Sequence, residues 1–296
     1  MGISGERQLN WLDAETLEFG GVQFLTNIAP EMHRTKSTSS RFYLLKDKLQ
    51  LDEYVKLSDE LHPRRVVELG VLQGGSTVLY DKLFNPSKLI AFELGGSVPA
   101  LDAYVAQNGS GRINVNYGVN QVDRSVITEV LRRELGTEPL DLVIDDASHL
   151  LRETRTSFNI LFPRLRPGGC YVVEDWGWEH WPGRFQEKNV SFAGTPALTN
   201  LVFEFVMTAA SRPDVVANVQ VRRDMAIVRR GEASIGDDFD ISRSYLIRDH
   251  AEFATLFSPS EDSAFALARR LRRLTERQPM LKKLMPSAAK LARKYM

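Results

Sequence analysis

Apolar residues follow two alternating patterns along the middle of the chain. Short runs that are apolar almost throughout predict buried strands, and longer stretches with apolar positions three or four residues apart predict helices. The strands are expected at residues 64–70, 88–96, 112–118, 141–146 and 169–176. The helices are expected at residues 51–62, 99–109, 123–136, 153–165 and 199–210, with a further helix directly after the glycine-rich segment 71–77. Pro167 and Gly168 are expected to end the helix at 153–165.

Residues 215–231 break this alternation. They contain two apolar runs joined by Arg222, Arg223 and Asp224, which predicts an antiparallel hairpin. The repeated strand and helix units ahead of the hairpin predict a mostly parallel sheet with helices on both faces. The expected fold class is therefore α/β, a Rossmann-like, doubly wound sheet of seven strands with an antiparallel terminal hairpin. We expect three regions, an N-terminal helical or lid segment (1–62), the α/β domain (63–232) and a C-terminal extension (233–296).

Composition adds limits to this picture. The chain has 296 residues, 43% of them hydrophobic, which is typical of one large globular domain with an appendage. Cys170 is the single cysteine, and the first ten residues lack the apolar core of a signal peptide. We therefore expect a cytoplasmic protein without an internal disulfide. No apolar run in the sequence approaches the roughly 20 residues that a membrane-spanning helix needs.

Charge is distributed unevenly, although the formal net charge is zero. Residues 268–296 contain ten Lys or Arg residues and one acidic residue, Glu276, so this tail carries +9 and the rest of the chain −9. An acidic main domain argues against a nucleic acid partner, because binding phosphates needs a basic face. Leu267, Leu271 and Leu274 form the apolar side of a basic amphipathic helix. Such a helix is expected to dock on the acidic body, to pair with another subunit in a homo-oligomer, or to lie peripherally on an anionic membrane.

Polar residues gather where the predicted strands end. A doubly wound sheet binds ligands at the carboxyl ends of its strands, so these positions form the candidate site. They are Glu68 and Gly70 after the first strand, Glu93 after the second, Asn120, Gln121 and Asp123 after the third, Asp145 and Asp146 after the fourth, and Glu174 and Asp175 after the fifth.

The first of these positions belongs to a glycine-rich loop, VELGVLQGGST. Its glycine spacing differs from the G-x-G-x-x-G fingerprint of dinucleotide-binding proteins. A longer loop preceded by an acid resembles motif I of class I S-adenosylmethionine-dependent methyltransferases, and Glu93 lies where a carboxylate can accept hydrogen bonds from both ribose hydroxyls. The alternative is a glycine turn that only joins a strand to a helix. The resemblance implies S-adenosyl-L-methionine as the cofactor, with contacts from Glu68, Gly70, Gly74, Ser76, Glu93, Asn120, Gln121, Asp123 and Asp145.

Four carboxylates lie at the ends of the last two predicted strands, Asp145, Asp146, Glu174 and Asp175. They would repel one another unless a cation or hydrogen-bond donors compensated them. A divalent metal ion is the simplest compensation, and carboxylate oxygens suit Mg²⁺, Mn²⁺ or Ca²⁺. One alternative is a purely structural rim, in which Asp145 caps the helix that begins near Leu150. Another is an iron site made of Asp146, His149 and His180.

The segments DDASH (145–149) and RPGGCYVVEDW (166–176) carry a more specific resemblance. They resemble the macrocin and mycinamicin sugar O-methyltransferases of antibiotic biosynthesis, whose motif has one strand ending in D-D-G-S-H and the next ending in E-D. The resemblance spans residues 64–182, with Ala147 in place of the commoner glycine. It implies Mg²⁺ dependence, a metal site at Asp146, Glu174 and Asp175, and catalysis by Asp146 together with His149 as the general base.

Methyl transfer to a sugar hydroxyl needs this combination of groups. The hydroxyl is a poor nucleophile at neutral pH, so attack on a sulfonium methyl needs a Lewis acid to acidify the alcohol and a base to remove its proton. The expected function is Mg²⁺-dependent, S-adenosylmethionine-dependent O-methylation of a sugar or glycoside. Two other functions stay open, O-methylation of a catechol or lipid hydroxyl and a catalytically silent cofactor-binding module that recruits a partner.

Two further segments are candidates for the surroundings of the site. Trp176, Trp178 and Trp181 follow the last acidic strand end, and aromatic faces stack on the apolar faces of sugars. The alternative is that these residues only pack their loop against the domain. Residues 32–49 are polar and rich in hydroxyl groups, which is typical either of a mobile lid over a cofactor or of a simple linker.

Overall fold

The computed structural model describes residues 9–26, 35–180 and 196–246. The chain divides into two compact units, Met1–Gly177 with Ala197–Tyr245, and Trp178–Pro196 with Leu246–Met296. Both sheets lie in the first unit. The second unit begins with a short 3₁₀ helix, η4 (Trp178–His180).

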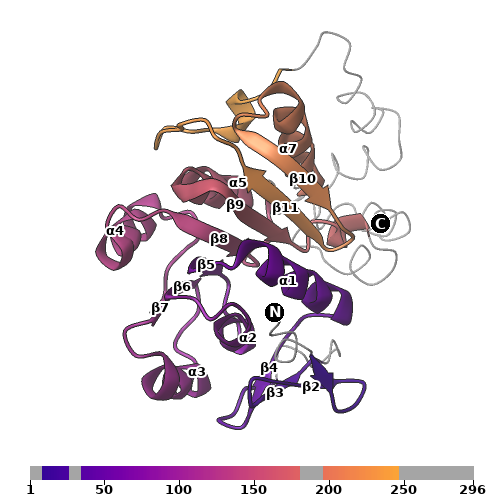
Figure 1. Ribbon diagram of the computed structural model, residues 1–296, viewed down its shortest axis with the longest axis vertical. Helices are drawn as coiled ribbons and strands as arrows, with labels where there is room; N and C mark the ends of the chain where they lie inside the picture. The colour runs from indigo at the N-terminus through magenta and orange to yellow at the C-terminus, as the bar shows by residue number, and fades with distance from the viewer. Residues whose placement is uncertain (1–8, 27–34, 181–195, 247–296) are drawn as a thin grey trace, which may run out of the picture. The chain divides into compact units, whose positions relative to one another are not determined.

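A seven-stranded sheet forms the centre of the first unit (Figure 1). Its strands, in spatial order, are β10 (Val216–Val221), β11 (Met225–Arg230), β9 (Leu165–Glu174), β8 (Leu140–Asp145), β5 (Arg65–Leu69), β6 (Lys88–Glu93) and β7 (Ile113–Tyr117). Strands β5 to β9 pair in parallel, and β11 pairs antiparallel with both β9 and β10. The predicted fold class is confirmed, terminal hairpin included.

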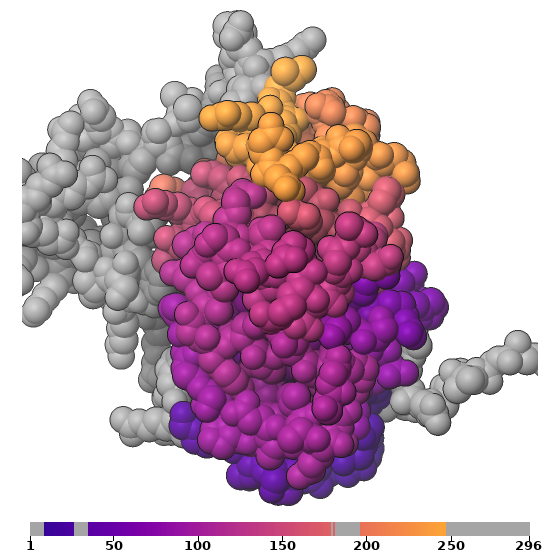
Figure 2. All heavy atoms as spheres, turned by 90° about the vertical axis from the view of Figure 1, so that its left-hand side faces the viewer, coloured from indigo at the N-terminus to yellow at the C-terminus, as the bar shows by residue number. Residues whose placement is uncertain are grey.

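Helices cover both faces of this sheet. They are α1 (Lys48–Leu61), α2 (Gly75–Phe84), α3 (Pro99–Tyr104), α4 (Arg124–Leu135), α5 (Leu151–Leu161) and α7 (Thr199–Ser211), with the π-helix η2 (Val105–Gly109) and the 3₁₀ helices η3 (Phe162–Arg164) and η5 (Ile241–Arg243). Helices α1, α2 and α3 pack on one face, and α4, α5 and α7 on the other. The β7 edge faces the viewer in Figure 2, where the purple to magenta residues form most of the visible surface.

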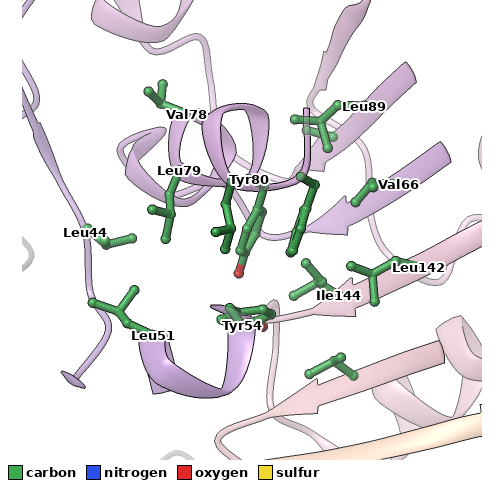
Figure 3. Close-up of a cluster of buried hydrophobic side chains, with 14 of the residues drawn as sticks. Leu44, Leu51, Tyr54, Val66, Val78, Leu79, Tyr80, Leu89, Leu142 and Ile144 are labelled. Carbon is green, nitrogen blue, oxygen red and sulfur yellow. The ribbon is translucent and has the colours of Figure 1, made fainter. Parts of the chain in front are cut away.

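The strand sequences explain the two cores. In β5, Val66 joins the cluster under α1 and α2, while Val67 and Leu69 join the cluster under α4 and α5, because successive side chains of a strand point to opposite faces. Figure 3 shows the first cluster, in which Tyr54 of α1 and Tyr80 of α2 lie together above the sheet. Their ring centroids are 5.1 Å apart.

Helix α5 ends earlier than the sequence pattern indicates. The helix was expected to continue to residue 165, but it ends at Leu161 and is followed by the 3₁₀ helix η3, which contains Pro163. Proline lacks the backbone N–H that a further α-helical turn requires. Pro167 and Gly168, the predicted terminators, lie within strand β9 instead, so this prediction is wrong.

A second, four-stranded sheet precedes α1 and was not predicted. It consists of β1 (Asn10–Trp11), β2 (Thr16–Phe19), β3 (Val22–Leu25) and β4 (Arg41–Tyr43) in that order. Strand β4 lies inside the stretch 32–49, for which the sequence predicts a lid or a linker, and it pairs in parallel with β3. Helix α1 follows after four intervening residues, and Asp47 and Gln50 form a capping box at its start.

Some predicted features fall outside what the structure describes. The basic amphipathic helix at Leu267, Leu271 and Leu274, and also Trp181, lie beyond the described residues. Within the described part of the chain, no helix combines the length and the apolar character that crossing a membrane requires.

Candidate functional site

A cavity of about 560 Å³ opens at the carboxyl ends of β5, β6, β8 and β9. Its lining includes eight of the predicted site residues, Gly70, Ser76, Glu93, Asn120, Gln121, Asp146, His149 and Asp175. Residues of the N-terminal segment, Tyr43, Leu45 and Lys46, also line the cavity. The remaining predicted residues of the first unit lie elsewhere, namely Glu68, Gly74, Asp123, Asp145, Glu174 and Trp176.

The glycine loop packs against other parts of the protein. Gly70 has a φ of +88°, and a Cβ there would come closer than 3.0 Å to the carbonyl oxygen of Asp146. A Cβ on Gly75 would collide with the carbonyl oxygen of Tyr43 in the same way. The glycines therefore let the loop that carries Asp146 and the N-terminal segment both approach the first βα turn.

Glu93 connects the glycine loop to the end of β6. Its Oε2 accepts hydrogen bonds from the backbone N–H groups of Val71 (2.7 Å) and Leu72 (2.9 Å), and its Oε1 accepts one from Gly95 (2.6 Å). Each carboxylate oxygen has two lone pairs, so Oε1 keeps one site for a ligand hydroxyl. The sequence predicted two such bonds to a ribose, and this geometry leaves room for one.

Glu68 is buried behind the loop and does not line the cavity. Its Oε2 accepts a hydrogen bond from the Thr77 hydroxyl (2.6 Å), and among the described residues its Oε1 has no hydrogen-bond partner. Burial raises the pKa of Glu68 to about 7, against the effect of hydrogen bonds from Ser76 and Thr77.

Replacing Glu68 by Gln is expected to make the free energy of unfolding less dependent on pH. The pKa of Glu68 is about 4.5 in the unfolded chain and about 7 in the folded state, so between these values only the folded state holds the proton. The free energy of unfolding of the wild type therefore falls as the pH rises through this window. Between urea titrations at about pH 5 and about pH 8, the Gln variant should lose roughly 2 kcal/mol less stability than the wild type.

The control for this measurement is Glu129→Gln, which changes an exposed carboxylate on α4. Glu129→Gln should follow the wild-type pH dependence. The same loss of stability in the wild type and in Glu68→Gln would show that Glu68 does not hold that proton.

Asp145 organises the loop after β8 from inside the core. Its Oδ2 accepts hydrogen bonds from the hydroxyls of Ser157 (2.5 Å) and Tyr171 (2.7 Å), and its Oδ1 accepts one from the Gln121 amide (3.3 Å). The other end of that amide accepts the backbone N–H of Ser148 (3.0 Å). Burial raises the pKa of Asp145 to about 6, while the two hydroxyls lower it. Asp145 thus fixes the loop that carries Asp146, although it does not line the cavity.

Asp146, His149 and Asp175 form the candidate metal centre. Each offers one ligand atom, and these atoms lie within 4.8 Å of one another. His149 and Asp175 adopt left-handed backbone conformations, with φ of +55° and +53°, and such strain in residues other than glycine clusters at functional sites. Burial and the neighbouring Asp146 carboxylate raise the pKa of Asp175. Two carboxylates and an imidazole are a suitable ligand set for a divalent ion.

Glu174, the fourth predicted acid, is bound by protein donors. It accepts two hydrogen bonds from Lys46 (2.6 and 2.7 Å) and others from the hydroxyls of Tyr54 and Tyr80. Burial and Asp146 raise the pKa of Glu174, and Lys46 lowers it. The structure therefore separates Glu174 from the group formed by Asp146, His149 and Asp175.

Lys46 is a charged site residue that the sequence did not reveal. It ends an apolar run, Phe42 to Leu45, inside a stretch that otherwise reads as a polar linker. A lysine directly after four apolar residues is a weak signal of burial. Its partners, Asp146 and Glu174, lie 100 and 128 positions away, so no local pattern links them.

The predicted residues Asp123, Trp176 and Trp178 lie outside the cavity lining. Asp123 caps α4 by accepting the backbone N–H of Val126. Trp176 donates its indole N–H to the carbonyl oxygen of Arg222 (2.8 Å), and Trp178 belongs to η4 in the second unit. Trp176 is therefore tied to the turn of the β10–β11 hairpin.

Comparison with known proteins finds similarity in part of the chain. No protein-family model matches it. Over 126 residues it is 34% identical to the demethylmacrocin O-methyltransferase of Streptomyces fradiae, covering 40% of this chain and 29% of that protein. Over 82 residues it is 39% identical to the mycinamicin VI 2''-O-methyltransferase of Micromonospora griseorubida, covering 23% of this chain and 21% of that protein.

The chain thus spans less than a third of the length of these relatives. The resemblance to macrocin and mycinamicin O-methyltransferases that the motifs indicated is confirmed over the matched segments. Among solved structures, the MycE methyltransferase from the mycinamycin biosynthetic pathway, in complex with Mg, SAH and mycinamycin VI, is 23% identical with a TM-score of 0.48. That match covers 67% of this chain and 52% of the other.

Proposed function

We propose that this protein is a class I S-adenosylmethionine-dependent methyltransferase that methylates a hydroxyl of a sugar or glycoside, with Mg²⁺ or a similar divalent ion as second cofactor. The observation that carries the proposal is the group of Asp146, His149 and Asp175 in the same cavity as Gly70 and Glu93. The similarity to macrocin and mycinamicin O-methyltransferases supports the class of acceptor.

The cavity fits a nucleoside cofactor in size and in polar groups. Its volume is within the range of small-molecule sites. We assign the ribose to the free lone pair of Glu93 Oε1 and the adenine to the wall that contains Asn120 and Gln121. Leu72 and Leu94, both exposed apolar residues of the lining, would be covered by the bound cofactor. Their burial would contribute to binding.

The donor set also fits a hard divalent ion. Mg²⁺ prefers oxygen ligands, so Asp146 and Asp175 are assigned as the ligands and His149 remains free for another task. A divalent ion held there would supply Lewis acidity that lowers the pKa of an acceptor hydroxyl.

His149 is assigned as the base. Its Nε2 would take the proton of the acceptor hydroxyl while the hydroxyl oxygen forms a bond to the methyl carbon, and the sulfonium sulfur keeps the electron pair of the bond that breaks. Asp146 Oδ1 lies 3.8 Å from His149 Nε2, so the assigned base stands directly beside the residues assigned to the metal.

The proposal is tested by methyl-transfer assays with the full chain, labelled S-adenosylmethionine and a panel of glycosides, catechols and lipid alcohols. Transfer to a glycoside is expected, stopped by a chelator and restored by Mg²⁺. Transfer only to a catechol or a lipid alcohol would show that the acceptor is not a sugar. Cofactor binding without transfer to any acceptor would favour the catalytically silent module. The cytoplasmic location, the homo-oligomer and the membrane contact of the tail stay predictions.

A further inference from the structure

Lys46 is a buried cation at the edge of the candidate metal centre. Its side chain is 1% exposed, and its Nζ donates to both oxygens of Glu174 and to Oδ2 of Asp146 (2.9 Å). It also lies over the rings of Tyr54 and Tyr80, at 5.8 and 5.9 Å from their centroids. All three protons of the ammonium group are therefore used.

Glu174 has no lone pair left for a metal ion in this arrangement. Its Oε1 accepts from Lys46, Tyr54 and Tyr80, and its Oε2 accepts from Lys46 and, at 3.4 Å, from Gln50. A carboxylate offers about four acceptor sites. Figure 3 shows Tyr54 and Tyr80 in the cluster between α1, α2 and the sheet, with the Tyr80 hydroxyl directed toward Tyr54.

The formal charges at the candidate metal centre match those of one divalent ion. Asp146, Glu174 and Asp175 contribute three negative charges, and Lys46 contributes one positive charge. Two negative charges remain, which one divalent ion would neutralise. Asp145 stands apart from this count because two hydroxyls and an amide satisfy its carboxylate.

We propose that Lys46 is a positioning residue of the metal centre, which occupies Glu174 and holds Oδ2 of Asp146 so that the ion is bound by Asp146 and Asp175 without Glu174. This inference rests on the divalent ion of the proposed function. Lys46 is fixed in turn because Asp47 and Gln50 cap the helix that starts beside it. The N-terminal segment is then a permanent part of the site and not a removable lid.

The first arm of the test asks whether Glu174 is a ligand. Mn²⁺ binding to the full chain is measured by calorimetry and by the electron paramagnetic resonance of free Mn²⁺. Asp175→Asn removes a ligand and should weaken Mn²⁺ binding by about 10-fold or more. Glu174→Gln keeps the shape of the side chain and removes one negative charge but no ligand, so its loss of Mn²⁺ affinity should be at least about threefold smaller than that of Asp175→Asn.

The second arm removes the ammonium group. Lys46→Met frees the Glu174 carboxylate, so Mn²⁺ gains a third carboxylate ligand and should bind about 10-fold more tightly. Adding Glu174→Gln to Lys46→Met should cancel this gain. Lys48→Met is the matched control, because it removes an exposed lysine two positions away and should leave Mn²⁺ binding unchanged.

The outcomes separate this inference from the proposed function. A Glu174→Gln variant that loses as much Mn²⁺ affinity as Asp175→Asn, or a Lys46→Met variant that binds Mn²⁺ no more tightly than the wild type, overturns the role of Lys46 alone. Wild-type protein that binds no Mn²⁺ overturns both the ion and this inference. The expected affinity pattern without methyl transfer to any acceptor supports the role of Lys46 and overturns the proposed function. If Lys46→Met does not fold, the Mn²⁺ affinities of Glu174→Gln and Asp175→Asn decide whether Glu174 is a ligand.

Discussion

Asp175→Asn is expected to lower the rate of methyl transfer by about 10³-fold or more, while the affinity for S-adenosylhomocysteine stays within about threefold of wild type. Asp175 is assigned as a metal ligand, and without its charge the acceptor hydroxyl keeps its high pKa. Asn is the suitable replacement because it tolerates the left-handed backbone at this position, where φ is +53°. Single-turnover rates and calorimetry with S-adenosylhomocysteine give the two quantities.

Asp238→Asn is the control, since Asp238 is exposed and does not line the cavity. It should keep the wild-type rate and cofactor affinity. Substantial methyl transfer by Asp175→Asn, especially with a chelator present, would remove Asp175 from the mechanism. Loss of S-adenosylhomocysteine binding together with activity would mean that Asp175 supports the cofactor pocket and not the transfer step.

Gly70→Ala should destabilise the protein by more than about 4 kcal/mol or prevent it from folding. Two costs add together at this position. The left-handed backbone, with φ of +88°, disfavours any residue with a Cβ, and that Cβ would collide with the carbonyl oxygen of Asp146. The collision involves backbone on both sides, so a change of rotamer cannot relieve it. Urea unfolding of purified variants measures the effect.

Two other glycines separate these costs. Gly111 also has a positive φ of +77°, but a Cβ there would meet no atom within 4 Å, so Gly111→Ala should cost only about 1–2 kcal/mol. Gly96 likewise has open space around it, and Gly96→Ala should be close to neutral. Equal stability of Gly70→Ala and Gly111→Ala would show that the contact with Asp146 is relieved by a backbone shift.

Most of the central domain could be predicted from the sequence. Strand β8, LDLVID, is buried at every position, and a run of this kind is a local signal of a strand covered on both faces. Parallel strands bring their carboxyl ends to one edge, and Gly70, Glu93, Asp146 and Asp175 accordingly line one cavity. The helix after β8 was predicted at residues 153–165, and it begins two residues earlier, at Leu151, and ends at Leu161, before Pro163.

The N-terminal sheet could not be predicted in the same way. Strands β1 to β4 have two to four residues each, too short for a periodic pattern to be distinguished from a polar linker. Their pairing depends on packing against the rest of the unit. The carbonyl oxygen of Tyr43, for example, lies where a side chain on Gly75 would be.

The sequence by itself determined the order of strands and helices in the central α/β domain and the edge at which the polar residues meet, because hydrophobic periodicity and strand direction are local properties of the chain. Only the tertiary structure decided which acids face the cavity. Glu174 and Asp175 are adjacent in the sequence, yet Glu174 binds Lys46 in the core and Asp175 joins Asp146 and His149. Packing between distant segments sets the direction of the Glu174 side chain and brings it to Lys46, 128 positions away. Such packing leaves no pattern in the neighbouring residues.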